Sequence, residues 1–177
     1  MNYFQFYQLP ESFLLDEKTV KQIYYRLSRE YHPDFYTLEP AEKQQEILEL
    51  STLNTNAYRT LSDFDRRMQY LLEQHGLLEE GSNHALPNDF LMEVMDLNEQ
   101  LMELEMDFDA AVYAAVQHQT AAFETELKES IWPTLEGYEN FPPDRQAEAL
   151  QAVKNYYLKR RYLLRIQDSL HKFAPHS

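Results

Sequence analysis

A chain of 177 residues with 44% hydrophobic content can bury a core as one medium domain or two small ones, and this composition argues against wholesale disorder. The formal net charge of −14 opposes binding to nucleic acid and to anionic membranes, because both are polyanions. The sequence contains no cysteine, which excludes disulfides, thiolate nucleophiles and cysteine-ligated metal sites within it.

The composition predicts an all-α protein. Only three glycines are available for tight turns, while Ala, Leu, Glu, Gln and Lys, which favour helix, are frequent. No apolar run approaches the roughly 20 residues of a membrane span, and we expect no signal peptide. Two helical blocks are separated by a polar stretch, so we predict a first domain over residues 1–76, a linker over 77–86 and a second domain over 87–177.

The first long helix is predicted over residues 17–31, with Asp16 as its N-cap. Its apolar side chains share one face, and four basic residues occupy the opposite one: Lys18, Lys21, Arg26 and Arg29. A basic helix face is usually only solvated. In a chain of net charge −14, however, four positive charges on one helix also form a local patch suited to an acidic partner.

The tripeptide His32-Pro33-Asp34 ends this helix. Because proline disfavours α geometry at the preceding residue, we expect His32 to be extended and the tripeptide to lie on an exposed loop. The loop offers an imidazole, a rigid bend and a carboxylate but no nucleophile, so it is suited to presenting hydrogen-bonding groups to another protein. Helices are predicted over residues 40–61 and 64–73, and the first of these forms a hairpin with residues 17–31.

Three longer helices are predicted after the linker. From Asn88, a possible N-cap, apolar residues recur at spacings typical of a helix-bundle seam: Phe90, Val94, Leu97, Leu101, Leu104 and Phe108. A second helix is predicted to end at Trp132-Pro133, and a third begins after Pro143 and runs to about Phe173. A three-helix bundle is the simplest arrangement of these elements.

The face opposite the seam is rich in methionine. At roughly 100–200° around the helix from Phe90 lie Leu91, Met92, Met95, Glu99, Met102 and Met106. One interpretation is a middle helix that packs on both sides, which chemistry alone favours. The other is an exposed and adaptable binding surface.

No catalytic or metal-binding constellation stands out in the sequence. It has no Gly-rich phosphate loop and no His-Glu-x-x-His or Glu-x-x-His pattern. The acidic residues between Glu103 and Asp109 alternate with apolar ones at helical spacing, which indicates a solvated helix face rather than a calcium site. We therefore expect no enzyme activity, no catalytic residue, no metal site and no cofactor.

Several motifs of the first block occur together in one known family. They are Tyr3-Phe4 with Phe6-Tyr7 and Leu9-Pro10, Tyr24-Tyr25-Arg26-Leu27, His32-Pro33-Asp34, Asn54 with Asn56-Ala57-Tyr58, and Arg66-Arg67-Met68-Gln69-Tyr70-Leu71-Leu72. With them the block resembles the J domain of HscB co-chaperones, and the second block has the length and position of that family's scaffold-binding bundle. Tyr25 and Glu30 stand where general J domains often carry lysine, which suggests a dedicated chaperone. The resemblance is to the bacterial form, without the N-terminal zinc site of eukaryotic relatives.

The resemblance implies an adaptor with two partners. The His32-Pro33-Asp34 loop, with Lys21, Arg26 and Arg29, would dock on an ATP-bound HscA/DnaK-type chaperone and stimulate its ATPase. A scaffold protein of iron–sulfur cluster assembly (IscU type) would bind an apolar and acidic surface: Leu91, Met92, Met95, Asp96, Glu99 and Tyr157. This interpretation favours exposure of the methionine face and a cytoplasmic location, with neither nucleic acid nor a membrane as partner. The alternatives are a J-domain protein for a different client and a purely structural helical adaptor.

Overall fold

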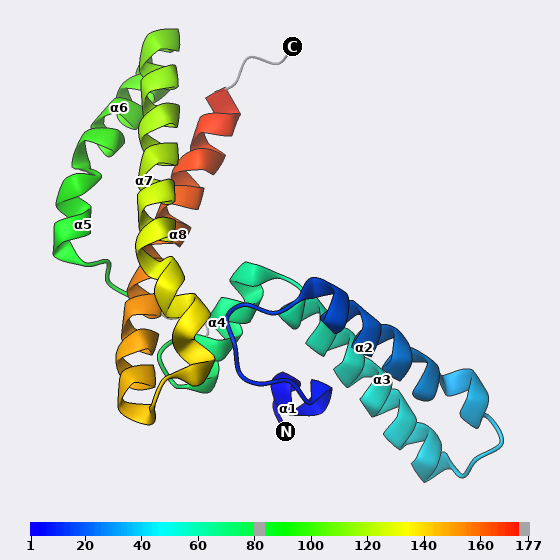
Figure 1. Ribbon diagram of the computed structural model, residues 1–177. Coiled ribbons are helices and arrows are strands. Elements are labelled where there is room, and N and C mark those ends of the chain that lie inside the picture. The colour runs from blue at the N-terminus through cyan, green and yellow to red at the C-terminus, as the bar shows by residue number, and fades with distance from the viewer. Residues whose placement is uncertain (80–83, 174–177) are drawn as a thin grey trace. The chain divides into compact units, whose positions relative to one another are not determined.

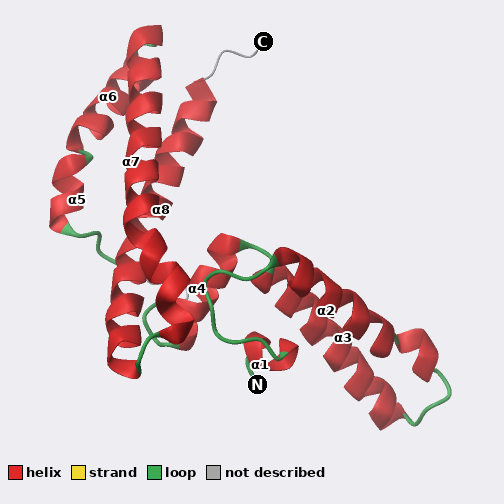
Figure 2. Cartoon of the chain, viewed as in Figure 1, coloured by secondary structure: helices red, strands yellow, loops and turns green. Residues whose placement is uncertain are grey.

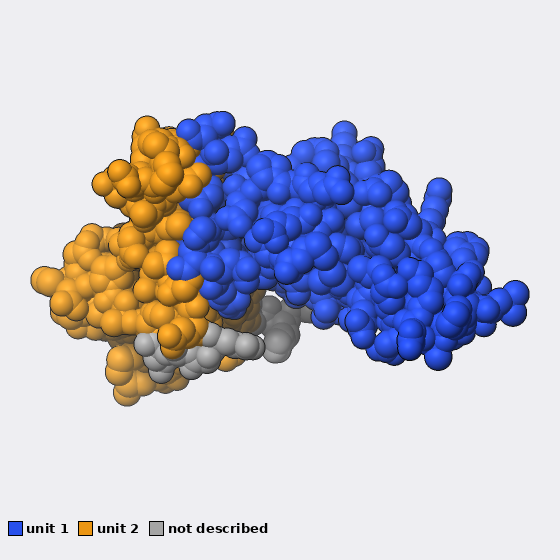
Figure 3. Space-filling view, turned by 90° about the horizontal axis from the view of Figure 1, so that it is seen from below, with its two compact units in different colours: residues 1–75, 138–140 blue, residues 76–137, 141–177 orange. Residues whose placement is uncertain are grey.

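The computed structural model describes residues 1–79 and 84–173, and every regular element in these ranges is a helix (Figure 2). The all-α prediction is therefore confirmed. The chain divides into two compact units: unit 1 contains Met1–His75 and Tyr138–Asn140, and unit 2 contains Gly76–Gly137 and Phe141–Ser177 (Figure 3). The predicted linker includes residues 80–83, which lie outside the described residues, so the domain boundaries stay a prediction.

Unit 1 is built on a helical hairpin. Helices α2 (Glu17–Glu30) and α3 (Ala41–Leu61) lie side by side, and the loop that joins them contains a short 3-10 helix, η1 (Pro33–Tyr36) (Figure 1). The short helix α1 (Tyr3–Tyr7) packs on α3, and α4 (Phe64–Gln74) continues from the end of α3. The predicted hairpin with short flanking helices is confirmed.

A side-chain cap fixes the start of α2. The Asp16 carboxylate accepts hydrogen bonds from the Thr19 backbone N–H at 2.9 Å and from the Thr19 hydroxyl at 2.6 Å. These bonds favour the ionised carboxylate, so the pKa of Asp16 is lowered, chiefly by the Thr19 side chain. The predicted N-cap is confirmed, and the start of the basic helix is set by its own sequence.

A buried polar network ties three helices of unit 1 together. Asn54 of α3 is buried, and its amide nitrogen donates to the Tyr24 carbonyl at 3.1 Å and to the Ser28 hydroxyl at 3.0 Å, both on α2. Its amide oxygen accepts from the Tyr7 hydroxyl of α1 at 2.9 Å. Burial raises the pKa of Tyr7, which keeps the phenol protonated as a donor. Satisfied buried networks of this kind specify one register between helices, so Asn54 sets the position of α2 on α3.

Unit 2 contains four helices in its described part. They are α5 (Asn88–Glu93), α6 (Met95–Met106), α7 (Ala110–Gly137) and α8 (Pro143–Phe173). Helices α7 and α8 pack along each other, and α6 packs on both (Figure 1). Because α5 and α6 together take the place of one long helix, the arrangement corresponds to the predicted three-helix bundle.

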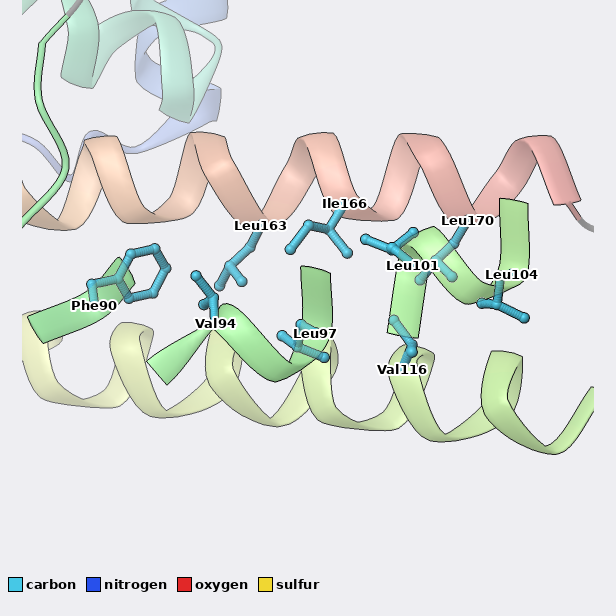
Figure 4. Packing of buried hydrophobic residues seen from close by; sticks show 9 residues of the cluster. All are labelled: Phe90, Val94, Leu97, Leu101, Leu104, Val116, Leu163, Ile166 and Leu170. Atoms are coloured by element: carbon cyan, nitrogen blue, oxygen red, sulfur yellow. The ribbon is translucent and has the colours of Figure 1, made fainter. Parts of the chain in front are cut away.

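The core of unit 2 lies between these helices. Leu163, Ile166 and Leu170 of α8 point toward the apolar side chains of α5 and α6, with Val116 of α7 beside them (Figure 4). The buried side chains of α5 and α6 are the predicted seam: Phe90, Val94, Leu97, Leu101 and Leu104. The side of the helix that faces the core is therefore the predicted one.

Three predictions about the first helix of unit 2 are corrected. The predicted single helix from Asn88 is broken at Val94, whose φ of −95° and ψ of 4° are not helical, and the residue preceding the helix is Pro87. Phe108 was expected in the seam but is exposed, because α6 ends at Met106 and Asp107 is extended. The helical repeat predicts which way a side chain faces only within the helix, and Phe108 lies beyond its end.

The predicted end of the next helix at Trp132-Pro133 is also wrong. Helix α7 continues through Pro133 to Gly137. Proline cannot donate the helical hydrogen bond to the carbonyl four residues earlier, which normally ends or kinks a helix. Here Ile131 and Leu135 on either side of it are both buried, while Pro133 is exposed. Burial of this apolar pair outweighs the lost hydrogen bond, and tertiary packing overrides the local signal.

Candidate functional site

The first candidate surface is the loop at the end of α2. His32 is extended, at φ −74° and ψ 120°, as the following proline predicts, and it caps η1. Its Nδ1 accepts the Asp34 backbone N–H at 3.3 Å, and Nδ1 lies 3.8 Å from Asp34 Oδ2. A neutral imidazole that accepts at Nδ1 carries its proton on Nε2. His32, Pro33 and Asp34 are all exposed, so the loop presents an N–H donor and a carboxylate to solvent.

Hydrogen bonds on both sides hold this loop in one shape. The Tyr36 hydroxyl donates to the Glu30 carbonyl at the end of α2, at 2.8 Å. The Gln44 side chain, on α3, donates to the Thr37 carbonyl at 3.2 Å and to the Glu39 carbonyl at 2.8 Å. The short loop is thereby bonded to both helices that it joins. It can present its donor and acceptor at low entropic cost on binding.

The predicted basic face of α2 is exposed. All four basic residues are exposed: Lys18, Lys21, Arg26 and Arg29. The opposite face of the helix is packed into the core through the buried side chains of Val20 and Leu27. Arg26 forms an ion pair with Glu30 at 3.5 Å, and Lys21 lies 5.9 Å from the centre of the Tyr25 ring. An exposed pair one helical turn apart contributes only about 0.3–0.5 kcal/mol, so Arg26 can exchange Glu30 for a carboxylate of a partner.

Two exposed apolar residues beside the loop were not predicted as site residues. Phe35 follows the tripeptide, and its ring centre lies 5.4 Å from that of His32. Leu38 is the other, and both side chains are exposed. The available signal was their position: apolar residues in a polar turn have no helical face to join, so solvent or a partner must cover them.

The second candidate surface lies on α5 and α6. We define the methionine surface as Leu91, Met92, Met95, Met102 and Met106, all of which are exposed. Leu91 is 43% exposed, Met92 78% and Met95 57%. Asp96 and Glu99 are exposed as well. Of the two interpretations of this face, burial is excluded, and the structure favours an exposed apolar and acidic surface.

The predicted aromatic of the last helix is corrected. Tyr157 is 4% exposed and lies in the core, so its side chain is not available to a partner. Tyr162, five residues later on α8, is half-buried, and its hydroxyl donates to Asn98 Oδ1 of α6 at 2.7 Å. It lines a groove of about 490 Å³ between α6 and α8, together with Met102. The sequence signal that could have indicated Tyr162 is Asn98, because a polar side chain next to the apolar seam needs a hydrogen-bond partner.

The described part of the chain was searched for groups of metal-ligating side chains and for helices that could span a membrane. Residues 1–79 and 84–173 contain no group of three His, Asp or Glu side chains placed to hold a metal ion. None of the described helices combines the length and the apolar character needed to cross a membrane.

Comparison with known families identifies both parts of the chain. A family model described as the DnaJ domain matches residues 2–70, and one described as the HSCB C-terminal oligomerisation domain matches residues 86–171. The HscB co-chaperone homologue of Vibrio vulnificus is 31% identical over 144 residues, which cover 75% of this chain and 84% of that protein. The HscB co-chaperone of Buchnera aphidicola is 36% identical over 106 residues, covering 59% of this chain and 61% of that one.

Solved structures agree with these matches. The crystal structure of the human co-chaperone HscB matches with a TM-score of 0.70 and 26% identity, over 99% of this chain and 84% of that one. The HscB structure from Vibrio cholerae has the same fold, with a TM-score of 0.59 and 24% identity, over 96% of this chain and 99% of that chain.

Proposed function

Because the chain belongs to the HscB family of J-domain co-chaperones, we propose that it delivers an IscU-type iron–sulfur cluster scaffold to an HscA/DnaK-type chaperone and stimulates that chaperone's ATPase. In this proposal the protein is an adaptor and not an enzyme. ATP is hydrolysed in the chaperone, and the cluster is cargo of the scaffold. We propose the cytoplasm as the location of this activity, in keeping with the bacterial relatives.

The observation that carries the proposal is the exposed His32-Pro33-Asp34 loop, held by hydrogen bonds to both helices of a J-domain hairpin. The loop has no nucleophile, so any effect on hydrolysis has to be exerted through contact with another protein. The Asp34 backbone N–H donates to His32 Nδ1 at 3.3 Å, so the imidazole and the Asp34 carboxylate are presented together on one short turn. A donor and an acceptor presented together can select one conformation of the chaperone, and binding energy then favours the hydrolysing state.

The basic face of α2 supports the encounter with the chaperone. Lys21, Arg26 and Arg29 are exposed on the helix that leads to the loop. Charges on the rim of an interface mainly raise the association rate, and salt screens them beyond about 8 Å. This face therefore favours an acidic partner surface, whereas the chain as a whole, at net charge −14, repels one.

The methionine surface supports scaffold binding by its apolar area and its charge. Flexible methionine side chains adapt to a partner, and Leu91 adds a branched apolar contact. Asp96 and Glu99 flank them. Between Asn88 and Asp109 the sequence has no Lys, Arg or His but eight carboxylates: Asp89, Glu93, Asp96, Glu99, Glu103, Glu105, Asp107 and Asp109. The surface thus favours a partner whose contact region is apolar and basic. We propose Tyr162, in place of the buried Tyr157, as a further contact for this partner beside the methionine surface.

Two assays test the proposal. The first captures purified scaffold on the immobilised protein and measures the dissociation constant. The second measures steady-state ATP hydrolysis by the chaperone with the protein alone, with the scaffold alone and with both. We expect stimulation by the protein alone and a larger effect with both. Stimulation without scaffold binding would indicate a J-domain protein for a different client, and the absence of both would leave a structural adaptor.

A further inference from the structure

The six methionines of the chain differ sharply in their accessibility. Four lie on the methionine surface, where Met92 and Met95 are 78% and 57% exposed and Met102 and Met106 are 65% and 89% exposed. Met68, in the core of unit 1, is 0% exposed. The exposed methionines are therefore concentrated on the surface proposed to bind the scaffold, apart from Met1 at the start of the chain.

We propose that these four thioethers are oxidation sites and that their conversion to methionine sulfoxide switches off scaffold docking while chaperone stimulation persists. This inference rests on the proposed function of the methionine surface. The oxidant is hydrogen peroxide. The chain becomes a co-chaperone that can engage its chaperone but no longer delivers its client.

The chemistry requires only the exposed sulfur and the oxidant. A lone pair of the sulfur attacks one oxygen of hydrogen peroxide, the S–O bond forms, the O–O bond breaks, and after proton transfer the other oxygen leaves as water. The sulfur loses two electrons, and the peroxide gains them. Reactivity follows exposure, and the sequence has no cysteine thiolate that would react first. Met68 is shielded by the core of unit 1.

The consequence follows from the surroundings of the four sulfurs. A thioether is apolar and only a weak acceptor, whereas a sulfoxide oxygen is polar and has to keep hydrogen bonds when a partner covers it. The segment from Asn88 to Asp109 holds eight carboxylates and no basic side chain, and Arg165 of α8 lines a groove with Met102. The carboxylates compete with each sulfoxide for the basic groups of the partner, and a sulfoxide that the apolar part of the partner covers loses its hydrogen bonds to water. Leaving one such group unpaired weakens binding about tenfold or more.

The His32 loop is insulated from this reaction. The residues that hold it, Glu30, Tyr36 and Gln44, contain no sulfur. The helices of the hairpin, α2 and α3, contain no methionine. Oxidation should thus separate the two proposed activities of one protein.

The test treats the full chain with hydrogen peroxide and locates the added oxygens by peptide mass spectrometry. Binding to the purified scaffold and ATPase stimulation without scaffold are measured before treatment, after it, and after repair by methionine sulfoxide reductases. A leucine variant, Met92→Leu with Met95→Leu, Met102→Leu and Met106→Leu, is carried through the same steps. Its binding after treatment is divided by its own binding before, so any effect of the substitutions themselves cancels.

We expect sulfoxide at the four sites and an intact Met68, a loss of scaffold affinity of about tenfold or more, and stimulation within about twofold of its starting value. Repair should restore affinity, and the leucine variant should keep a ratio near one. Unchanged affinity of the oxidised chain overturns the proposal, as does a loss that repair does not reverse or that the leucine variant shares. If the untreated chain does not bind the scaffold, the proposed function itself fails, and this is seen before peroxide is added.

Discussion

Replacing Leu91, Met92 and Met95 together by Ala tests whether the methionine surface binds the client. Burying one such side chain in a complex contributes about 1.5–3 kcal/mol before ordering costs, so three contribute roughly 5–9 kcal/mol. Even if ordering costs remove half of this, scaffold binding should weaken by roughly 100-fold or more. The free protein should lose little, because exposed substitutions change stability by about 0.5 kcal/mol each.

The control for this variant is Leu97→Ala on α6, the helix that also carries Met95. Leu97 is buried in the core of unit 2, and its truncation should cost about 2–5 kcal/mol. Thermal melting by circular dichroism should therefore separate the two proteins, and isothermal titration with the scaffold measures the affinity. The reasoning is refuted if the triple variant melts as early as Leu97→Ala, or if it stays folded and binds the scaffold with unchanged affinity. Stimulation of the chaperone without scaffold should be normal, because the His32 loop belongs to unit 1.

Three further predictions concern unit 1. His32→Gln should abolish ATPase stimulation in a steady-state assay while changing stability by less than about 0.5 kcal/mol, because His32 is exposed. Reversing Arg26 and Arg29 to Glu should slow association with the chaperone in stopped-flow measurements, and added salt should slow the wild type toward the variant. Asn54→Ala should lower the free energy of unfolding by about 1–3 kcal/mol in urea titrations, because it removes the buried hydrogen bonds of the amide to α1 and α2, while the Tyr7 hydroxyl keeps its bond to the backbone carbonyl of residue 54.

Each of these variants has a matched control in the chain. His118→Gln makes the same change at an exposed histidine of α7 and should leave stimulation intact. Arg59→Glu with Arg66→Glu changes the net charge equally at exposed positions outside α2, so an equal loss of rate would show that only net charge matters. Asn56→Ala removes an exposed amide from α3, and a cost like that of Asn54→Ala would contradict the role of the buried network.

The sequence predicts those parts of the fold that depend on local signals. Asp16 as a cap and Pro33 as the end of a helix depend on interactions within a few residues of the chain. The seam from Phe90 to Leu104 packs against distant helices, but its helical repeat is visible in the sequence. The errors arise where distant contacts decide. Pro133 stays inside α7 because residues on both sides of it are buried, and no local pattern contains that information.

The candidate site shows the same division. The tripeptide and the basic face follow from sequence, since a proline and a helical period fix them. Exposure of the methionine surface does not, because a helix with two apolar faces fits equally well between neighbours and at the edge of a bundle. Tyr157 and Tyr162 likewise have similar surroundings in sequence. The packing of α8 decides between them: Tyr157 is buried, and Tyr162 is half-buried with its hydroxyl bonded to Asn98.

The charges of the two proposed docking surfaces have a consequence for specificity. The α2 face is basic, with four exposed cations, and the segment between Asn88 and Asp109 carries only negative charge. A partner selected by one surface is repelled by the other, so discrimination comes from unfavourable as well as favourable contacts. An acidic chaperone surface would be attracted to α2 and repelled by α6, and a basic scaffold surface would be attracted to α6 and repelled by α2. Added salt should weaken the binding of each partner to its own surface. It should also reduce the repulsion from the other surface, because salt screens attractive and repulsive charge interactions alike.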